Sequence, residues 1–203
     1  MVIGENVTSI DSLAFYGCSR LKSIVVDEGN TTYDSRENCN AIIETASNKL
    51  IRGCVATAIP EGVTSIGKWA FSKCEDLETL VLPSTITSLD EEILGGDYGV
   101  MPQDIYCYAE EVPSAENAFR YTYIQAITLH VPESAYEEYK NTEPWSKFGN
   151  IVKEKAVSVV SVSDNAPTIA SRYSLSGQHL TAPQRGINVV KMSDGTVKKV
   201  LVK

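Results

Sequence analysis

VTSIGKWAFSKC (residues 63–74) nearly repeats VTSIDSLAFYGC (residues 7–18), with seven identical letters at an offset of 56 residues. A second alignment places PSTITSLDEEIL (residues 83–94) under PEGVTSIGKWAF (residues 60–71), at an offset of 23 residues. In both alignments the apolar letters coincide, and in the second one proline lies over proline. Periods of this size are typical of solenoids, in which each repeat forms one coil of a stack. The repeat therefore predicts a stacked solenoid.

Each coil is expected to contain a short strand whose apolar residues face one side. The two clearest copies have their inward positions at Leu21, Ile24, Val26, Leu77, Leu80 and Leu82. Weaker copies occur at residues 2–3, 57–59, 105–107 and 127–131. The sequence thus predicts about six stacked strands. Because no coil can bury its apolar face alone, we expect like residues to form continuous columns, with Val7, Ile66 and Leu89 sharing one core.

A longer segment, NCNAIIETASNKLIRGC (residues 38–54), interrupts the repeat. Two apolar runs, residues 41–43 and 50–53, flank turn-forming residues at 45–48. This pattern is typical of a β-hairpin. We therefore expect a hairpin insertion at about residues 31–55.

The cysteines allow two interpretations. Cys18, Cys54 and Cys74 each precede a strand by three residues, which predicts a ladder of small buried thiols at one corner of the coils. Pairing hairpin residues whose numbers sum to 93 places Cys39 opposite Cys54, where a disulfide is an alternative. The spacing contains no Cys-x-x-Cys pair, so no metal site is expected.

After residue 131 the repeat gives way to an aromatic segment. Glutamates follow Pro132, as they do at the start of a helix, and aromatic or apolar letters recur at Tyr136, Tyr139, Trp145, Phe148 and Ile151. Residues 132–154 are therefore predicted to form a helical cap over the exposed end of the stack. Residues 155–203 contain alternating strand-forming residues and the turn-forming pair Asp194-Gly195. This pattern predicts a small all-β tail.

Composition excludes several classes of protein. The chain has 203 residues, 43% of them hydrophobic, which is enough for one or two domains with a packed core. Residues 156–203 have a net charge of +4, so the remainder of the −8 chain is at −12, which argues against nucleic acid as the main partner. The sequence contains no run of about 18 apolar residues, so a membrane span is not expected. The repeat pattern begins within residues 1–10, which do not have the features of a signal peptide. We therefore expect the chain to be a fragment of a longer protein.

No constellation for catalysis is expected. Nucleophilic chemistry needs a histidine near a Cys or Ser, and the least unfavourable pair is Cys107 with His130. The acids Asp90, Glu91 and Glu92 are interpreted as a charged outer surface. The oxygen-rich stretch DEGNTTYDSRENCN (residues 27–40) lacks the spacing of a calcium loop and is interpreted as a polar loop. The sequence therefore predicts no enzyme, no cofactor and no metal.

The phrases VTSIGKWAFSKC, LETLVLPSTITSL and NCNAIIETASNKLIRGC resemble the BspA-like leucine-rich repeats of bacterial surface proteins, over roughly residues 2–153. The resemblance implies an α+β repeat protein, with a right-handed leucine-rich-repeat solenoid at residues 1–131. It also implies an extracellular or surface address and adhesion to host or matrix proteins or glycans. The ending YSLSGQHL…GINVV…KKVLVK is similar to the sorting tails of the type IX secretion route in Gram-negative anaerobes.

If Leu, Ile and Val face inward, the opposite face of the strands offers a surface to a partner. Tyrosine and histidine gather on its later coils, and the predicted binding residues are Val81, Tyr106, Tyr108, Thr128 and His130. Tyrosine supplies rigid, half-polar contact area of the kind that protein and sugar partners meet. The alternative is that these rings only cover the sheet beside the cap. We therefore expect a non-enzymatic recognition module, or alternatively a structural spacer that presents another domain.

Overall fold

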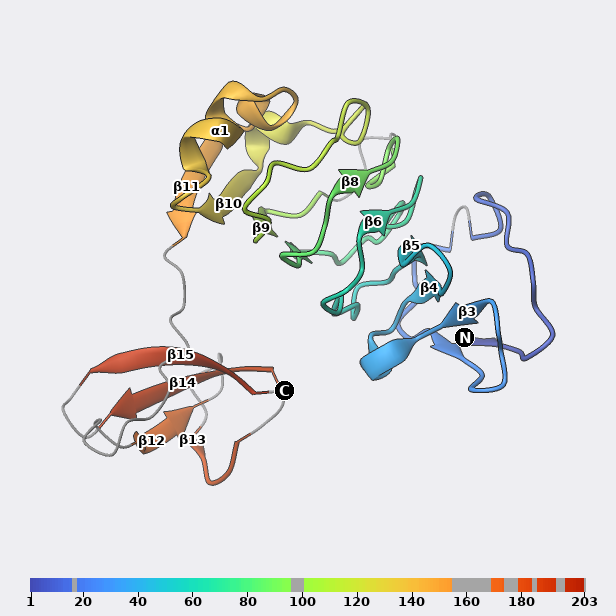
Figure 1. Cartoon of the computed structure of the whole chain (residues 1–203), viewed down its shortest axis with the longest axis horizontal. Coiled ribbons are helices and arrows are strands. Elements are labelled where there is room, and N and C mark those ends of the chain that lie inside the picture. The colour runs from blue at the N-terminus through green and yellow to red at the C-terminus, as the bar shows by residue number, and fades with distance from the viewer. Residues whose placement is uncertain are drawn as a thin grey trace. The chain divides into compact units, whose positions relative to one another are not determined.

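The computed structural model describes residues 1–15, 18–95, 101–154, 169–173, 179–183, 186–192 and 196–202. The chain forms two compact units, Met1–Glu154 and Lys155–Lys203. Figure 1 shows the first unit as a stack of coils with strands in successive turns. The coils of the repeat are therefore present in the first unit.

A four-stranded parallel sheet forms one side of the later coils. Its strands, in spatial order, are β7 (Thr79–Leu82), β9 (Asp104–Cys107), β10 (Thr128–Pro132) and β11 (Asn150–Glu154). Inward positions lie directly opposite one another, as in the row Leu80, Ile105, Leu129 and Ile151. Burial alternates along β7 and β9, with Leu80 and Leu82 buried and Val81 exposed, as the spacing of the apolar letters predicts.

A second, five-stranded sheet joins the hairpin region to the coils that follow it. Its strands, in spatial order, are β3 (Tyr33–Asp34), β4 (Ile42–Glu44), β5 (Lys49–Arg52), β6 (Ser65–Ile66) and β8 (Ser88–Leu89). The predicted hairpin is β4 and β5, and β5 continues the stack because Leu50, Ile66 and Leu89 are register partners. The predicted column is thus confirmed for Ile66 and Leu89, which belong to one buried core.

The first coils form a separate core. Among the described strands, β1 (Val2–Ile3) and β2 (Val25–Val26) pair only with each other, and Val7 packs in a cluster around Ile3 and Ile24. Val7 therefore does not share the core of Ile66 and Leu89, and that part of the prediction is wrong. The hairpin insertion explains the break: no strand forms at residues 57–59, where the Ala58 amide donates to the Cys39 carbonyl instead.

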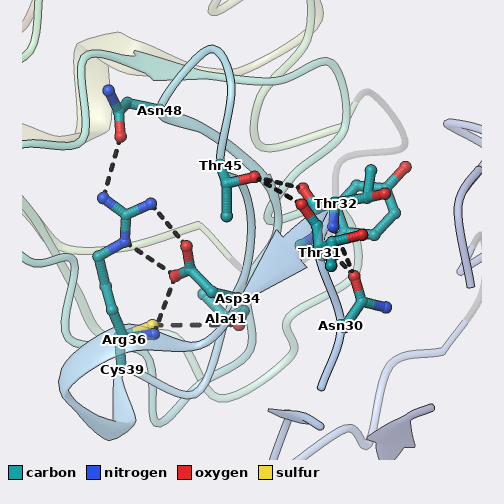
Figure 2. A network of polar contacts seen from close by, with 10 residues as sticks. Asn30, Thr31, Thr32, Asp34, Arg36, Cys39, Ala41, Thr45 and Asn48 are labelled. Atoms are coloured by element: carbon teal, nitrogen blue, oxygen red, sulfur yellow. Dashed lines mark hydrogen bonds and ion pairs between the residues drawn. The ribbon is translucent and has the colours of Figure 1, made fainter. Parts of the chain in front are cut away.

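Polar side chains hold the hairpin to the first coils (Figure 2). The Asn30 amide group donates to the carbonyls of Gly4 and Val7. Its oxygen accepts from the backbone amides of Thr32 and Tyr33. Thr45 Oγ1 donates to the Thr32 carbonyl at 3.0 Å.

In the same network Arg36 makes a bidentate ion pair with Asp34 and donates to Asn48 Oδ1 at 2.9 Å. The oxygens of Asn30 and Asp34 are thus engaged within the protein. Residues 30–36 of the stretch considered for calcium therefore form a hydrogen-bonded polar loop.

The cysteines are all free thiols. The predicted hairpin register holds at Ile43 with Leu50, but an irregularity between Ile42 and Ile43 shifts it by one residue beyond that point. Cys39 and Cys54 are consequently not joined, and each thiol lies near a carbonyl oxygen of its own hairpin. Of the predicted thiol ladder, Cys54 and Cys74 are buried, whereas Cys18 is exposed.

The end of the stack is covered by a short helix and an aromatic cluster. Helix α1 (Tyr136–Asn141) and the turn η3 (Trp145–Lys147) bring Trp145 against Phe119, Tyr139 and Phe148, with ring centroids 5.3 to 6.1 Å apart. The indole of Trp145 donates to the Pro113 carbonyl at 2.8 Å. The expected helical segment ends before residue 150, however, because β11 adds a strand to the parallel sheet.

The second unit contains an antiparallel sheet of four strands. Their spatial order is β13 (His179–Leu180), β12 (Ile169–Tyr173), β14 (Gly186–Met192) and β15 (Val197–Val202). Strands β14 and β15 pair up to Lys191 with Val197, on either side of the expected Asp194-Gly195 turn, which lies outside the described residues. Part of the tail phrase YSLSGQHL, residues 174–178, also lies outside them.

Candidate recognition surface

The five predicted binding residues lie on one face of the parallel sheet. The register places Val81, Tyr106, His130 and Val152 in a single row across β7, β9, β10 and β11. A second row on the same face contains Thr79, Asp104, Thr128 and Asn150. We call the two rows, together with Tyr108 and Glu154, the outer sheet face. It exists because successive side chains of a strand alternate between core and surface.

Aromatic rings occupy the middle of the outer sheet face. Tyr106 and His130, which are register partners, stack with ring centroids 4.1 Å apart and an interplanar angle of 11°. Tyr108 follows along β9, and its ring centroid lies 6.2 Å from that of Tyr106. On the β7 side, the register neighbour of Tyr106 is Val81, which is 45% exposed. In this row, the stacked rings of Tyr106 and His130 are therefore followed on the β7 side by the small aliphatic side chain of Val81.

His130 is held between two carboxylates. Its Nε2 lies 2.8 Å from Asp104 Oδ1 on β9, and its Nδ1 lies 2.8 Å from Glu154 Oε1 on β11. A neutral imidazole has one N–H, so only the protonated ring donates to both carboxylates. The His130 side chain is 13% exposed, whereas those of Asp104 and Glu154 are 36% and 35% exposed. The three side chains link β9, β10 and β11 at the surface.

Sequence reasoning identified His130 but missed both carboxylates. Asp104 stands two residues before Tyr106, so the alternation of β9 would place both on one face. Glu154 was missed because residues 132–154 were expected to form a helical cap and not a strand. Only the pairing of β10 with β11 brings it beside His130.

The surroundings of Tyr106 and Tyr108 further favour the neutral form of their hydroxyls. Burial raises the pKa of Tyr106, and the nearby charges of Asp104 and Glu154 raise it further. Burial likewise raises the pKa of Tyr108, followed by the effects of Glu154 and Tyr106. Both groups therefore remain phenols at neutral pH, each able to donate one hydrogen bond and to accept others. This combination suits a contact surface.

The structure separates Cys107 from His130, the least unfavourable pair for nucleophilic chemistry. Cys107 faces the core, where its thiol lies 3.2 Å from the Tyr139 hydroxyl, and Tyr139 donates to the Ala109 carbonyl. His130 lies on the opposite face of the sheet, so the two cannot act as a nucleophile and base. Within the described ranges, no three His, Cys, Asp or Glu side chains are grouped as metal ligands.

The acids Asp90, Glu91 and Glu92 serve contacts between coils. Asp90 pairs with Lys49 at 2.8 Å, and Glu91 pairs with Lys68 at 2.6 Å. Glu92 accepts a hydrogen bond from the indole of Trp69, one repeat of 23 residues earlier. These groups stabilise the stack, and they lie apart from the outer sheet face in sequence and sheet. In the part of the chain that is described, no helix has the length and apolar character needed to cross a membrane.

Comparison with known proteins gives a family match. The sequence matches the BspA type leucine rich repeat region, in six copies, over residues 1–49 and 51–142. No curated protein matches the chain, and no solved structure does. The matched residues make up more than half of the chain and include β1 to β10, apart from Leu50 in β5, and helix α1. The chain therefore belongs to the BspA type leucine-rich repeat family.

Proposed function

We propose that this chain is a non-enzymatic recognition module that binds a protein or a glycan through the outer sheet face. The family is associated with bacterial cell-surface proteins, and its repeats are typically scaffolds for protein interaction. A surface address, and export from a Gram-negative cell through a sorting tail, are parts of this proposal. They rest on the similarity of the C-terminal sequence to such sorting tails.

The observation that carries the proposal is the stacked pair Tyr106 and His130 on a regular, solvent-facing sheet. Aromatic rings that are fixed before binding lose little conformational entropy when a partner docks. Tyr106 is fixed by its stack, and His130 by two carboxylates on neighbouring strands. A rigid, half-polar centre with exposed neighbours such as Val81 has the composition of an interface core.

Binding by paired tyrosine variants tests the proposal. The double variant Tyr106→Ala, Tyr108→Ala should lose binding to any ligand found on a panel of matrix proteins and glycans. The matched control is Tyr121→Ala, Tyr123→Ala, which removes two exposed tyrosines from the loop before β10.

The control should bind such a ligand as the wild type does. Equal binding by all three proteins would exclude the outer sheet face. A structural spacer would then explain the chain better.

A further inference from the structure

The outer sheet face carries acidic groups and no basic residue other than His130. The outward positions of its four strands are Thr79, Val81, Asp104, Tyr106, Thr128, His130, Asn150, Val152 and Glu154. Lysine and arginine are absent from this set, although the chain contains 18 of them. Even with a protonated His130, the two carboxylates leave the face with a net negative charge.

Each carboxylate also has capacity for a further partner. Asp104 and Glu154 each use one oxygen for His130, and no hydrogen bond to the second oxygen occurs among the described residues. Both side chains are about one third exposed, so a partner can approach them from solvent. A carboxylate accepts several hydrogen bonds and prefers a charged donor.

The aromatic row offers a second contact close to these acids. One ring face of Tyr106 is covered by His130, while its register neighbour on the other side is the small side chain of Val81. A flat cation placed over Val81 would meet the ring of Tyr106. Asp104, one of the two charges that raise the Tyr106 pKa, lies two residues away on the same strand face. Arginine stacks on aromatic rings and binds carboxylates with its planar group of donors.

We infer that the occupant of the outer sheet face is a protein segment that presents arginine side chains. This inference rests on the proposed function and names the chemistry of its partner. Lysine would supply the charge without the planar stacking on Tyr106. A neutral glycan would use the rings but would gain nothing from the negative charge of the face.

Binding of short peptide probes to the full chain tests the inference. Isothermal titration at physiological salt would compare hexa-arginine, hexa-lysine and hexa-glutamate peptides with maltohexaose. Hexa-arginine should bind most tightly, and Asp104→Asn, Glu154→Gln should weaken it about tenfold, as expected for the loss of charge-assisted hydrogen bonds. Preferred binding of maltohexaose or hexa-glutamate would overturn the inference.

A matched pair of charge variants separates site binding from general attraction to an acidic protein. Val81→Lys places a cation beside Tyr106, whereas Val25→Lys places one at an equally exposed outward position of β2; the two valines are 45% and 47% exposed. Val81→Lys should weaken hexa-arginine binding about tenfold, and Val25→Lys less than about twofold. Equal effects of the two variants would overturn the inference.

The same titrations distinguish failure of the inference from failure of the proposed function. If maltohexaose binds in preference and the Tyr106→Ala, Tyr108→Ala variant abolishes it, the face is a recognition surface with a different partner. If that variant changes the binding of no probe, the proposed function fails as well.

Discussion

Gly149 lies directly against the backbone of Gln125, so closely that a Cβ atom at position 149 would overlap the Gln125 carbonyl group. The Gly149 amide also donates to the Ile124 carbonyl at 3.3 Å. This contact joins the start of β11 to the turn η2 (Ile124–Ala126), which precedes β10. Glycine is therefore required here for close approach of two backbone segments, and the approach positions the last strand of the outer sheet face.

Gly149→Ala should destabilise the first unit by about 2 kcal/mol or more, because the added methyl group has no space and the backbone cannot shift freely. Urea denaturation followed by circular dichroism measures the change. The matched control is Gly4→Ala, where a Cβ would meet no atom within 4 Å, and it should stay within about 0.5 kcal/mol of the wild type. Equal stability of the two variants would contradict this contact.

His130→Ala should lower the free energy of unfolding by about 1–2 kcal/mol. The variant removes the imidazole that bridges Asp104 and Glu154, so both carboxylates lose that hydrogen-bond partner. The control Thr128→Ala alters the same strand and face beside Asp104, its register partner, but Thr128 makes no hydrogen bond with either carboxylate among the described residues. Adding Asp104→Asn to His130→Ala should restore part of the loss. No such recovery in a double-mutant cycle would show that the three side chains are not coupled.

Stability should decrease above pH 9. Burial raises the pKa of Cys74 from 9.0 to about 11, with the charge of Arg52 partly offsetting the effect. The thiol thus holds its proton more tightly in the folded protein. The contribution of the Cys74 thiol to the free energy of unfolding is complete below pH 9 and is lost as the pH rises to about 11.

Urea denaturation at pH 7, 9 and 10.5 measures this dependence. Replacing Cys74 by alanine should reduce the slope by about 1 kcal/mol per pH unit in that window, whereas Cys18→Ala should leave it unchanged. An unchanged slope in Cys74→Ala would contradict the assignment.

All five thiols should react with Ellman's reagent in denaturant without a reductant, because the hairpin bulge keeps Cys39 and Cys54 apart. Adding a reductant should not increase the count. A count of three that rises to five with reductant would show that the two cysteines form the disulfide after all.

Much of the stack could be predicted from the letters. The 23-residue offset predicts that Ile66 lies beside Leu89, and the structure confirms it. The spacing of Leu80 and Leu82 predicts that Val81 faces outward, which is also confirmed. Both follow from local periodicity, which is set by backbone geometry and the need to bury apolar side chains.

Other features depend on contacts that no local pattern contains. The step of three from Trp145 through Phe148 to Ile151 is typical of a helix, yet Gly149 lets the chain turn and pair β11 with β10. A single bulge between Ile42 and Ile43 is enough to shift Cys39 out of register. The grouping of Asp104, His130 and Glu154 requires the register of three strands, so it is visible only in the folded chain.

We propose that the outer sheet face is the surface with which this chain recognises its partner. Amide NMR spectra of the full chain, recorded during titration with hexa-arginine, test it most directly. Shifts concentrated on Val81, Tyr106, Tyr108, Thr128 and His130 are the predicted result. Shifts concentrated on the Asp90 to Glu92 side of the coils, with β9 and β10 unaffected, would contradict the claim.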